Sequence, residues 1–531
     1  MGVISLNKKI LGVSALSTML VLSACAGGGD EGSDAENSSE GSGSDEIILA
    51  TMSDAVSMDV HLTNDIPSAN MQVQVYEKLL TLDENNEVIP QLAEEWETVD
   101  DVTWEFKLRE DVTFHDGEPF NAEAVKANFD RILDEEIGSP RAVQYEMVDN
   151  VEVVDEYTVR FNLKYPFAPL LANLTNMGGS IISPAAIEAD YEAIENGDEA
   201  GSYINENPIG TGFLEFENWT PGEEMTLVKN EDYWDGEVAY DSFVFQIVPE
   251  GGTRVANLET GYAHIIDPLA PNEAARVEQM EGASLATQDS VGLNYIGFNT
   301  EKEPFDDPKV RQAVSMAINK EEIIEGIYDG YGEVATGPLA PVIPNAADLP
   351  GLEYDVEEAK SLLAEAGFED GFDTTIWTND NPQRMDIAVA TQDALTEIGV
   401  NVEVEVLEWG AYLEQTGEGL HDMFILGWSN QNANADTGLY PLFHSSQIGA
   451  AGNRFMIQDE ELDGFLDEAR QTTDEAEQEQ LYADAQERLI ELSPAIYLQH
   501  QTYLAGHLDE VEGFWMNASG LYQLKDVELT E

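Results

Sequence analysis

Residues 374–428 decide the fold class, and they read TTIWTNDNPQRMDIAVATQDALTEIGVNVEVEVLEWGAYLEQTGEGLHDMFILGW. Three runs rich in β-branched and aromatic residues have the composition of strands. Two segments between these runs carry apolar residues at helical spacing. Strands that alternate with helices are typical of a parallel-rich sheet covered by helices. The stretch therefore predicts an α/β unit with strands at 374–377, 402–407 and 423–428 and helices at 385–398 and 411–416.

The same rhythm extends on both sides of this stretch. A strand-like run begins at Leu293, and Asp307 to Asn319 has the pattern of a helix with Pro308 in its first turn. Two long helical segments, 459–471 and 474–491, precede a strand-like run at 495–498. These patterns predict one doubly wound α/β lobe over residues 293–498.

Residues 46–292 have a more mixed pattern, which predicts a separate first lobe. The main expected elements are strands at 47–51, 103–109 and 243–248, helices at 70–80 and 121–133, and a hairpin at 151–163. A chain of this length normally divides into at least two cores. If residues 499–531 return to the first lobe, the chain crosses between lobes twice, which predicts a hinge and a cleft that can close.

The N-terminus has the layout of a secretory signal peptide over residues 1–24. Lys8 and Lys9 precede an almost entirely apolar stretch, 10–21, that is short for a membrane-spanning helix. The run Leu22-Ser-Ala-Cys25 resembles the bacterial lipobox, in which the cysteine is acylated and becomes the mature N-terminus. The alternative is a cleaved signal followed by an incidental buried cysteine. We expect Cys25 to be lipidated and to hold the protein on the membrane.

Residues 25–45 follow the signal as a flexible acidic linker rich in glycine and serine. After Cys25 the segment has no aliphatic residue larger than alanine and no aromatic residue, so it cannot bury enough surface to fold. Its acidic residues lack the spacing of a calcium-binding loop. The linker is expected to let the folded part stand off the membrane.

Charge excludes one class of function. The chain has 23 basic and 105 acidic residues, a formal net charge of -82, which argues against nucleic-acid binding. Acidic residues occur along the whole chain, and this distribution predicts a surface adapted to high salt, where self-repulsion is screened. The alternative is that the acidic residues serve a cationic ligand.

Four stretches resemble family 5 of the bacterial extracellular solute-binding proteins, the dipeptide, oligopeptide, glutathione and nickel binders of ABC importers. They occur in the family's order and span most of the chain after the linker. They are residues 89–97 running on to 112–125, Asn207-Pro-Ile-Gly-Thr-Gly-Phe with Asn230-Glu-Asp-Tyr-Trp-Asp-Gly, residues 299–320, and Gly427-Trp-Ser leading to Leu442-Phe-His-Ser-Ser.

The resemblance implies a two-lobe periplasmic-binding-protein-like fold of class II, the large peptide-binding type. It adds an extra subdomain at about residues 80–200 in the first lobe, with a peptide-like ligand buried between the lobes. A permease and an ATPase are the implied partners, and we expect no cofactor and no metal ligands in the protein. The expected protein is a lipid-anchored monomer at the extracellular face of the cell membrane, or in the periplasm if there is an outer membrane.

Arg384 is the candidate partner of a ligand carboxylate. Enclosing a charged ligand away from water requires a partner for each ion, and the planar guanidinium binds carboxylates with two hydrogen bonds. Arg384 follows a predicted strand and opens a predicted helix. In the dipeptide-binding relatives a matching arginine binds the carboxylate. The alternative is a surface ion pair.

Other candidates come from the segment after Trp428 and from a segment near the start of the fold. Peptide binders of the family carry an aspartate three residues after the tryptophan, where this chain has Gln431. Asp436 or Asp65 could replace that amine anchor, although Asp436 could equally be a helix cap. Together with Asn64 and Asn432, these patterns are closer to the glutathione-binding branch. Trp377, Trp409 and Trp428 lie at strand ends and could form an aromatic wall, but core packing is equally open.

Other classes of function remain as alternatives. No zinc-protease motif, phosphate-binding loop or nucleophile elbow is present, so we expect a binding protein and not a peptide hydrolase. The seven histidines are scattered and form no close pair, which argues against direct nickel coordination, although a metal-chelate receptor remains open. A chaperone-like surface lipoprotein is a third alternative.

Overall fold

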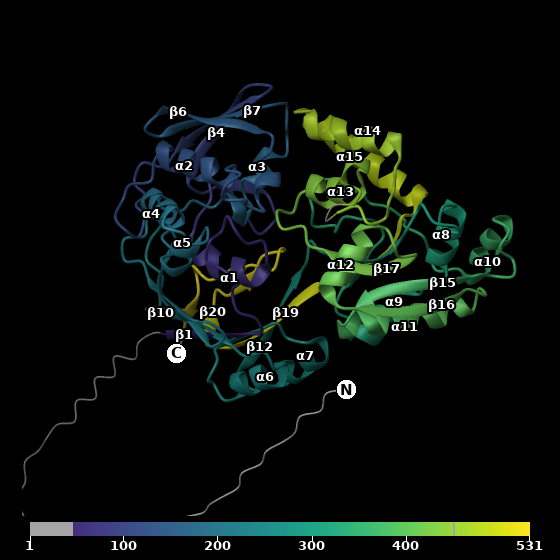
Figure 1. The fold of residues 1–531 in the computed structure, drawn as a ribbon. Coiled ribbons are helices and arrows are strands. Elements are labelled where there is room, and N and C mark those ends of the chain that lie inside the picture. Colours follow the sequence, from purple (N-terminus) through teal and green to yellow (C-terminus); the bar gives the residue numbers. More distant parts are fainter. Residues whose placement is uncertain (1–45, 450–451, 531) are drawn as a thin grey trace, which may run out of the picture. The chain divides into compact units, whose positions relative to one another are not determined.

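The computed structural model describes residues 46–449 and 452–530, and Figure 1 shows their arrangement. The signal peptide, Cys25 and the linker lie outside these residues. In the described part of the chain, no helix is both long enough and apolar enough to cross a membrane. The described residues belong to one compact unit, which contains a seven-stranded and a six-stranded sheet.

The seven-stranded sheet has β1 (Glu46–Thr51) near its centre, with a parallel strand on each side. Ile47, Leu49 and Ala50 of β1 are completely buried in the two cores that cover the sheet. The sheet order is β12 (Ala283–Asp289), β19 (Thr502–Leu508), β11 (Ile265–Asp267), β1, β10 (Ser242–Ile247), β9 (Glu224–Lys229) and β8 (Leu214–Thr220). Strand β19 therefore brings the end of the chain back to the first lobe.

A separate four-stranded antiparallel sheet also belongs to the first lobe. Its order is β4 (Ala93–Asp100), β5 (Thr103–Leu108), β7 (Thr158–Leu163) and β6 (Val148–Asp155). Helix α2 (Ala122–Ile132) begins after Asn121, whose side chain accepts a hydrogen bond from the Ala124 N–H. Phe129 of this helix meets Phe161 of β7 edge to face, with ring centroids 4.8 Å apart. The subdomain thus has its own core.

The six-stranded sheet confirms the strands and helices predicted at 374–428, but its pairing is less parallel than predicted. Its order is β14 (Glu333–Val334), β18 (Ala495–His500), β13 (Leu293–Phe298), β17 (Met423–Trp428), β15 (Asp373–Asn379) and β16 (Asn401–Leu407). Only β15 pairs in parallel, with β16 and β17, and the other pairs are antiparallel. The reason is topological, because β13 leads away from the first lobe and β18 leads back to it.

The two crossings between the sheets lie side by side. Residues 290–292 join β12 to β13, and Gln501 alone separates β18 from β19. The Ser290 N–H donates to the Gln501 carbonyl at 3.0 Å. After β19 the chain forms two small ladders, β20 (Val511–Glu512) with β23 (Glu528–Leu529) and β21 (Trp515–Met516) with β22 (Tyr522–Gln523).

The remaining elements are mostly helices. In the first lobe they are α1 (Ile66–Val75), β2 (Leu80–Leu82), β3 (Val88–Pro90), α3 (Leu170–Asn173), α4 (Pro184–Glu195), α5 (Ser202–Glu206), α6 (Gly251–Glu259) and α7 (Pro271–Glu278). In the second lobe they are α8 (Pro308–Met316), α9 (Lys320–Tyr328), α10 (Val356–Glu365), α11 (Pro382–Thr396), α12 (Trp409–Gly417), α13 (Ala435–Phe443), α14 (Glu460–Gln471) and α15 (Glu475–Leu492).

The helix predicted at 70–80 is wrong in its bounds. Helix α1 begins four residues earlier, because the Asp65 carboxylate accepts a hydrogen bond from the Ser68 N–H. It ends at Val75, and Leu80 joins β2. A Cβ atom on Gly210 or Gly212 would collide with the backbone at this end of the helix. The Asn207-Pro-Ile-Gly-Thr-Gly motif therefore packs its glycines against the terminus of α1, which local periodicity does not reveal.

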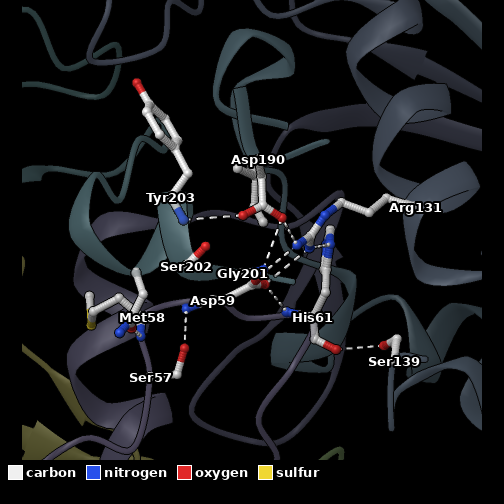
Figure 2. Close-up of polar contacts among 12 residues, drawn as sticks. Ser57, Met58, Asp59, His61, Arg131, Ser139, Asp190, Gly201, Ser202 and Tyr203 are labelled. Carbon is white, nitrogen blue, oxygen red and sulfur yellow. Dashed lines mark hydrogen bonds and ion pairs between the residues drawn. The ribbon is translucent and has the colours of Figure 1, made fainter. Parts of the chain in front are cut away.

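A buried ionic cluster fixes the segment that precedes α1 (Figure 2). Arg131 of α2 pairs with Asp59 at 2.7 Å and with Asp190 of α4 at 2.8 Å, and all three side chains are fully buried. Arg131 also approaches His61 Nδ1 at 3.0 Å, and because arginine only donates, Nδ1 accepts and His61 Nε2 donates to the Ser180 carbonyl. Burial, and then Arg131, hold the pKa of His61 well below its usual value. The cluster ties three elements of the first lobe together.

Candidate functional site

A cavity of about 500 Å³ lies in the first lobe beside α1, and Gln431 of the second lobe contributes to its wall. Such a volume is within the range of small-molecule binding sites. The other walls come from helix α1, the loop at residues 83–85, Tyr233 with Trp234, and the returning tail at 515–525. Segments that are far apart in sequence thus meet around one space.

Glu77 lies in one wall of this cavity and is hydrogen-bonded to residues of two of the motifs noted in the sequence. Its carboxylate accepts hydrogen bonds from Thr211 Oγ1 at 2.8 Å, from Tyr233 Oη at 2.9 Å and from Trp234 Nε1 at 2.9 Å. Burial raises the pKa of Glu77, and these three donors oppose that rise. The motifs at residues 207–213 and 230–236 therefore meet at one buried carboxylate, Glu77, to which neither motif pointed in the sequence.

Lys78 lies next to Glu77 and is almost completely buried, at 4 % exposed. Its ammonium Nζ lies 3.9 Å from the Met177 sulfur, a weak acceptor. Burial lowers the pKa of Lys78 to about 8, and the neighbouring Glu77 opposes this shift. No carboxylate in the described part of the chain forms an ion pair with it. Lys78 is a cavity residue that the sequence analysis did not single out.

Gln431 joins the two lobes through its side chain and its backbone. Its Nε2 donates to the Asn64 carbonyl at 3.2 Å, and its Oε1 accepts from Arg141 at 3.4 Å. Its carbonyl accepts from Ser519 Oγ of the tail at 2.8 Å. The neighbouring Asn432 donates to Asn173 Oδ1 at 3.1 Å. The structure thus brings three of the predicted residues, Asn64, Gln431 and Asn432, to one interlobe contact.

Arg141 is the charged member of this contact, and the sequence analysis missed it. Its side chain is 2 % exposed and donates to the Thr63 carbonyl at 2.6 Å and to Asn176 Oδ1 at 3.1 Å. Burial lowers the pKa of Arg141, and Asp65 is among the groups that oppose this shift. Its hydrogen-bond acceptors among the described residues are all neutral. The scarcity of basic residues in the sequence was the signal that could have identified it.

Arg384 lies apart from the cavity wall, at the start of α11. The Asn381 side chain caps this helix by accepting from the Arg384 N–H at 3.0 Å. The guanidinium is half-buried, donates to Asn379 Oδ1 at 3.1 Å and lies over the Trp409 ring, 5.6 Å from its centroid. Among the described residues it forms no ion pair, so most of its donors are available to a ligand.

Both aspartates considered as amine anchors already have partners inside the protein. Asp65 caps α1 and also accepts from Ser68 Oγ at 2.8 Å. Asp436 lies 3.0 Å from Arg470 in a buried ion pair. Burial raises the pKa of Asp436 to about 6, and Arg470 opposes the rise. The structure therefore gives each carboxylate a local structural role.

The three tryptophans have different environments. Trp377 is buried in the core of the second lobe, and its Nε1 has no hydrogen-bond partner in the described part of the chain. Trp428 is half-buried and donates to the Thr437 carbonyl at 2.9 Å. Trp409 is 43 % exposed and lies beside Arg384. Only Trp409 presents a large free surface.

Comparisons with known proteins agree on one family. The model of "bacterial extracellular solute-binding proteins, family 5 Middle" matches residues 87–450. A glutathione-binding protein GsiB of Pectobacterium atrosepticum is 32 % identical over 495 residues, which cover 92 % of this chain and 94 % of that protein.

Solved structures show the same likeness along most of the chain. The periplasmic binding protein DppA of Helicobacter pylori, in complex with the peptide STSA, has a TM-score of 0.78 at 31 % identity, over 92 % of this chain and 98 % of that one. HbpA2 of Haemophilus parasuis has a TM-score of 0.82 at 29 % identity, over 92 % and 100 %. The two-lobe fold is therefore that of the large peptide-binding proteins.

Proposed function

The chain belongs to family 5 of the bacterial extracellular solute-binding proteins, and from this membership we propose that it captures a glutathione-like or other short peptide for an ABC importer. The observation that carries this proposal is the cavity of about 500 Å³ whose wall contains residues of the first lobe, the returning tail and Gln431. A ligand that fills it would touch both lobes. Ligand binding would then favour the closed arrangement, which the permease recognises.

We propose residues 46–292, 293–498 and 499–531 as first lobe, second lobe and returning tail, with the hinge at the paired crossings. Support comes from the Ser290–Gln501 hydrogen bond and from the antiparallel course of the strands on both sides of it. Only two short segments have to change conformation for the lobes to separate. Hinges of this kind need few residues to absorb the change.

Ligand recognition is proposed to use charge from the second lobe and polar groups at the interlobe contact. Arg384 would bind a carboxylate, with Trp409 as an aromatic neighbour, while Asn64, Gln431 and Asn432 would bind peptide groups. Four other candidates would support the site without touching the ligand, because each already packs or pairs within the protein: Asp65, Asp436, Trp377 and Trp428. The proposed process involves no covalent change to the ligand.

A lipid anchor at Cys25 and a monomeric state at the outer face of the membrane complete the proposal. The signal-like segment before Cys25 and the extracellular family support this location. Expression of Cys25→Ala beside the unchanged protein tests the anchor. The variant should appear in the medium, and its retention in the membrane fraction would contradict anchoring by this residue.

Calorimetric titration of the mature protein with reduced glutathione, dipeptides, tetrapeptides and nickel–histidine tests the function. A one-to-one complex with a peptide-like ligand, without turnover in a parallel mass-spectrometric assay, is the expected result. Hydrolysis of a bound peptide would identify an enzyme, and exclusive binding of the nickel complex would identify a metal-chelate receptor.

A further inference from the structure

The ammonium of Lys78 is a buried charge in the cavity without a matching acceptor. It has three donors to satisfy, and its only polar contact in the described part of the chain is the Met177 thioether at 3.9 Å. A buried ammonium is costly unless it is paired or hydrogen-bonded. Its environment therefore requires an acceptor that the described residues do not provide.

The acidic residues of the cavity wall form no ion pair with Lys78 among the described residues. Glu77 already accepts from Thr211, Tyr233 and Trp234. Asp235 pairs with Lys525, the other lysine of the cavity wall. A further pair of acidic residues lies in the turn after β2: Asp83 accepts from the backbone N–H groups of Asn85 and Glu87, and Glu84 is exposed to solvent.

We propose that Lys78 binds a carboxylate of the peptide-like ligand inside the cavity, so that the cavity selects ligands with an anionic group at that end. This inference rests on the proposed function and names a residue that determines specificity. The apolar side chains of Ile66, Val73 and Met177 line the same space and would exclude water from the ion pair. Exclusion of water strengthens the pair and makes an uncharged analogue a poor substitute.

The pKa of Lys78 falls to about 8, which agrees with this assignment. The burial that lowers this pKa is the same burial that leaves the ammonium in need of an acceptor. A bound carboxylate would stabilise the charged ammonium and restore the pKa toward its ordinary value. A neutral amide in the same position would leave the ammonium unpaired. The ligand's charge, and not only its shape, is then recognised.

The test compares acid and amide forms of one ligand on matched variants. The probes are reduced glutathione and two analogues, one with the glycine carboxylate and one with the α-carboxylate of the glutamyl residue converted to a carboxamide. Calorimetry at pH 7 gives the Kd of each probe for the mature protein and for Lys78→Gln, Lys78→Met and Lys525→Gln. Thermal melts monitored by circular dichroism show that each variant is folded, and Lys78→Met serves if Lys78→Gln does not fold.

For the mature protein, one of the two amides should bind about 30-fold or more weakly than glutathione, as expected when one partner of a buried charge pair is removed. In the Lys78 variants the acid and that amide should bind within about threefold of each other. Lys525→Gln should show the same difference in Kd between glutathione and that amide as the unchanged protein, because Lys525 already has Asp235 as a partner.

Two negative results overturn the assignment and are distinguishable. In the first, the mature protein binds glutathione, but either both amides bind as tightly as glutathione or the weaker binding of an amide persists in the Lys78 variants. Lys78 then does not bind the carboxylate, whereas the proposed function stands. If the mature protein binds none of the three probes, this inference fails for glutathione-like ligands, whereas the titrations with dipeptides and tetrapeptides decide separately whether the proposed function stands.

Discussion

Arg141 and Gln431 are 290 residues apart in the sequence, and Arg141 Nη1 donates to Gln431 Oε1 at 3.4 Å across the two lobes. The same amide donates to the Asn64 carbonyl. One glutamine therefore holds a buried guanidinium of the first lobe and the backbone before α1. Because Gln431 also lines the cavity, a ligand in the cavity would meet a residue that joins the two lobes.

Gln431→Ala should weaken ligand binding, because it removes both interlobe hydrogen bonds and leaves Arg141 with one acceptor fewer. Hydrogen bonds to charged groups contribute about 1.5–3 kcal/mol, and the long distance here places the expected loss at the lower end. Calorimetry with the best ligand measures it. Gln447→Ala, at a partly exposed position of the second lobe outside the cavity wall, is the matched control. Equal affinity of the two variants would show that this contact does not support closure.

Arg384→Ala should reduce affinity for ligands that carry a free carboxylate by about 2–5 kcal/mol, the range for truncating a buried charge pair. Stability should change little, since the described residues offer no carboxylate to Arg384. Titration with a peptide and with its C-terminal amide separates charge recognition from packing on Trp409. Arg276→Ala, whose partner Glu259 is on the surface, is the control. An unchanged Kd would remove Arg384 from the site.

Arg131→Met should destabilise the protein by about 3–5 kcal/mol, because it leaves two buried carboxylates without their cation. Urea denaturation followed by tryptophan fluorescence measures the free energy of unfolding. Arg160→Met provides the comparison, since Arg160 is partly exposed and pairs with Glu105, and such a pair contributes about 1 kcal/mol or less. Similar losses in both variants would argue against a special role of the buried cluster.

Asp267 makes stability depend on pH between about 4 and 6. Burial raises the pKa of Asp267 from 3.8 to about 6, opposed by the hydrogen bond from Tyr522 and by Arg254. Because the pKa of Asp267 is higher in the folded than in the unfolded state, proton binding stabilises the folded state. This contribution to the free energy of unfolding is complete below pH 3.8 and is lost as the pH rises through 6. Asp267→Asn should therefore gain stability relative to the unchanged protein between pH 4 and pH 7, by up to about 3 kcal/mol.

Chemical denaturation at the two pH values checks this prediction. The free energy of unfolding of the variant, minus that of the unchanged protein, should be larger at pH 7. Asp241→Asn is a control on the surface, where Asp241 pairs with Lys229 and is 62 % exposed. A difference that does not change with pH would mean that Asp267 has the same protonation in both states.

Salt should stabilise the protein. With a net charge of -82, repulsion between surface carboxylates opposes the compact state, and at about 1 M salt the screening length falls to about 3 Å. The midpoint of thermal unfolding should therefore rise from dilute buffer to molar sodium chloride. Sucrose, which adds no ions, serves as the control. Equal midpoints in dilute buffer and in salt would refute adaptation to high salt.

The strands and helices of 374–428 were predictable because their periodicity is local. The end of α1 was not, because it depends on Gly210 and Gly212, which are more than 130 residues away. The antiparallel pairs around β13 were also missed, since pairing direction follows from where the chain enters and leaves the sheet.

For the site, the patterns shared with the family pointed to Gln431, Asn64 and Asn432 as ligand-binding candidates, which the structure places at one contact between the lobes. These patterns did not identify Arg141 or Lys78, whose significance comes from burial without an acidic partner among the described residues. Nor could they show that Asp436 already faces Arg470.

The sequence by itself determined the family, through the stretches that resemble it, and the strongly acidic composition, because both can be read from residues that are close together in the chain. It also predicts an export-type N-terminus, which lies outside the described residues. Only the tertiary structure decided which charges are paired inside the protein. Pairing depends on distance and burial, and these follow from contacts between segments hundreds of residues apart, which no local pattern encodes.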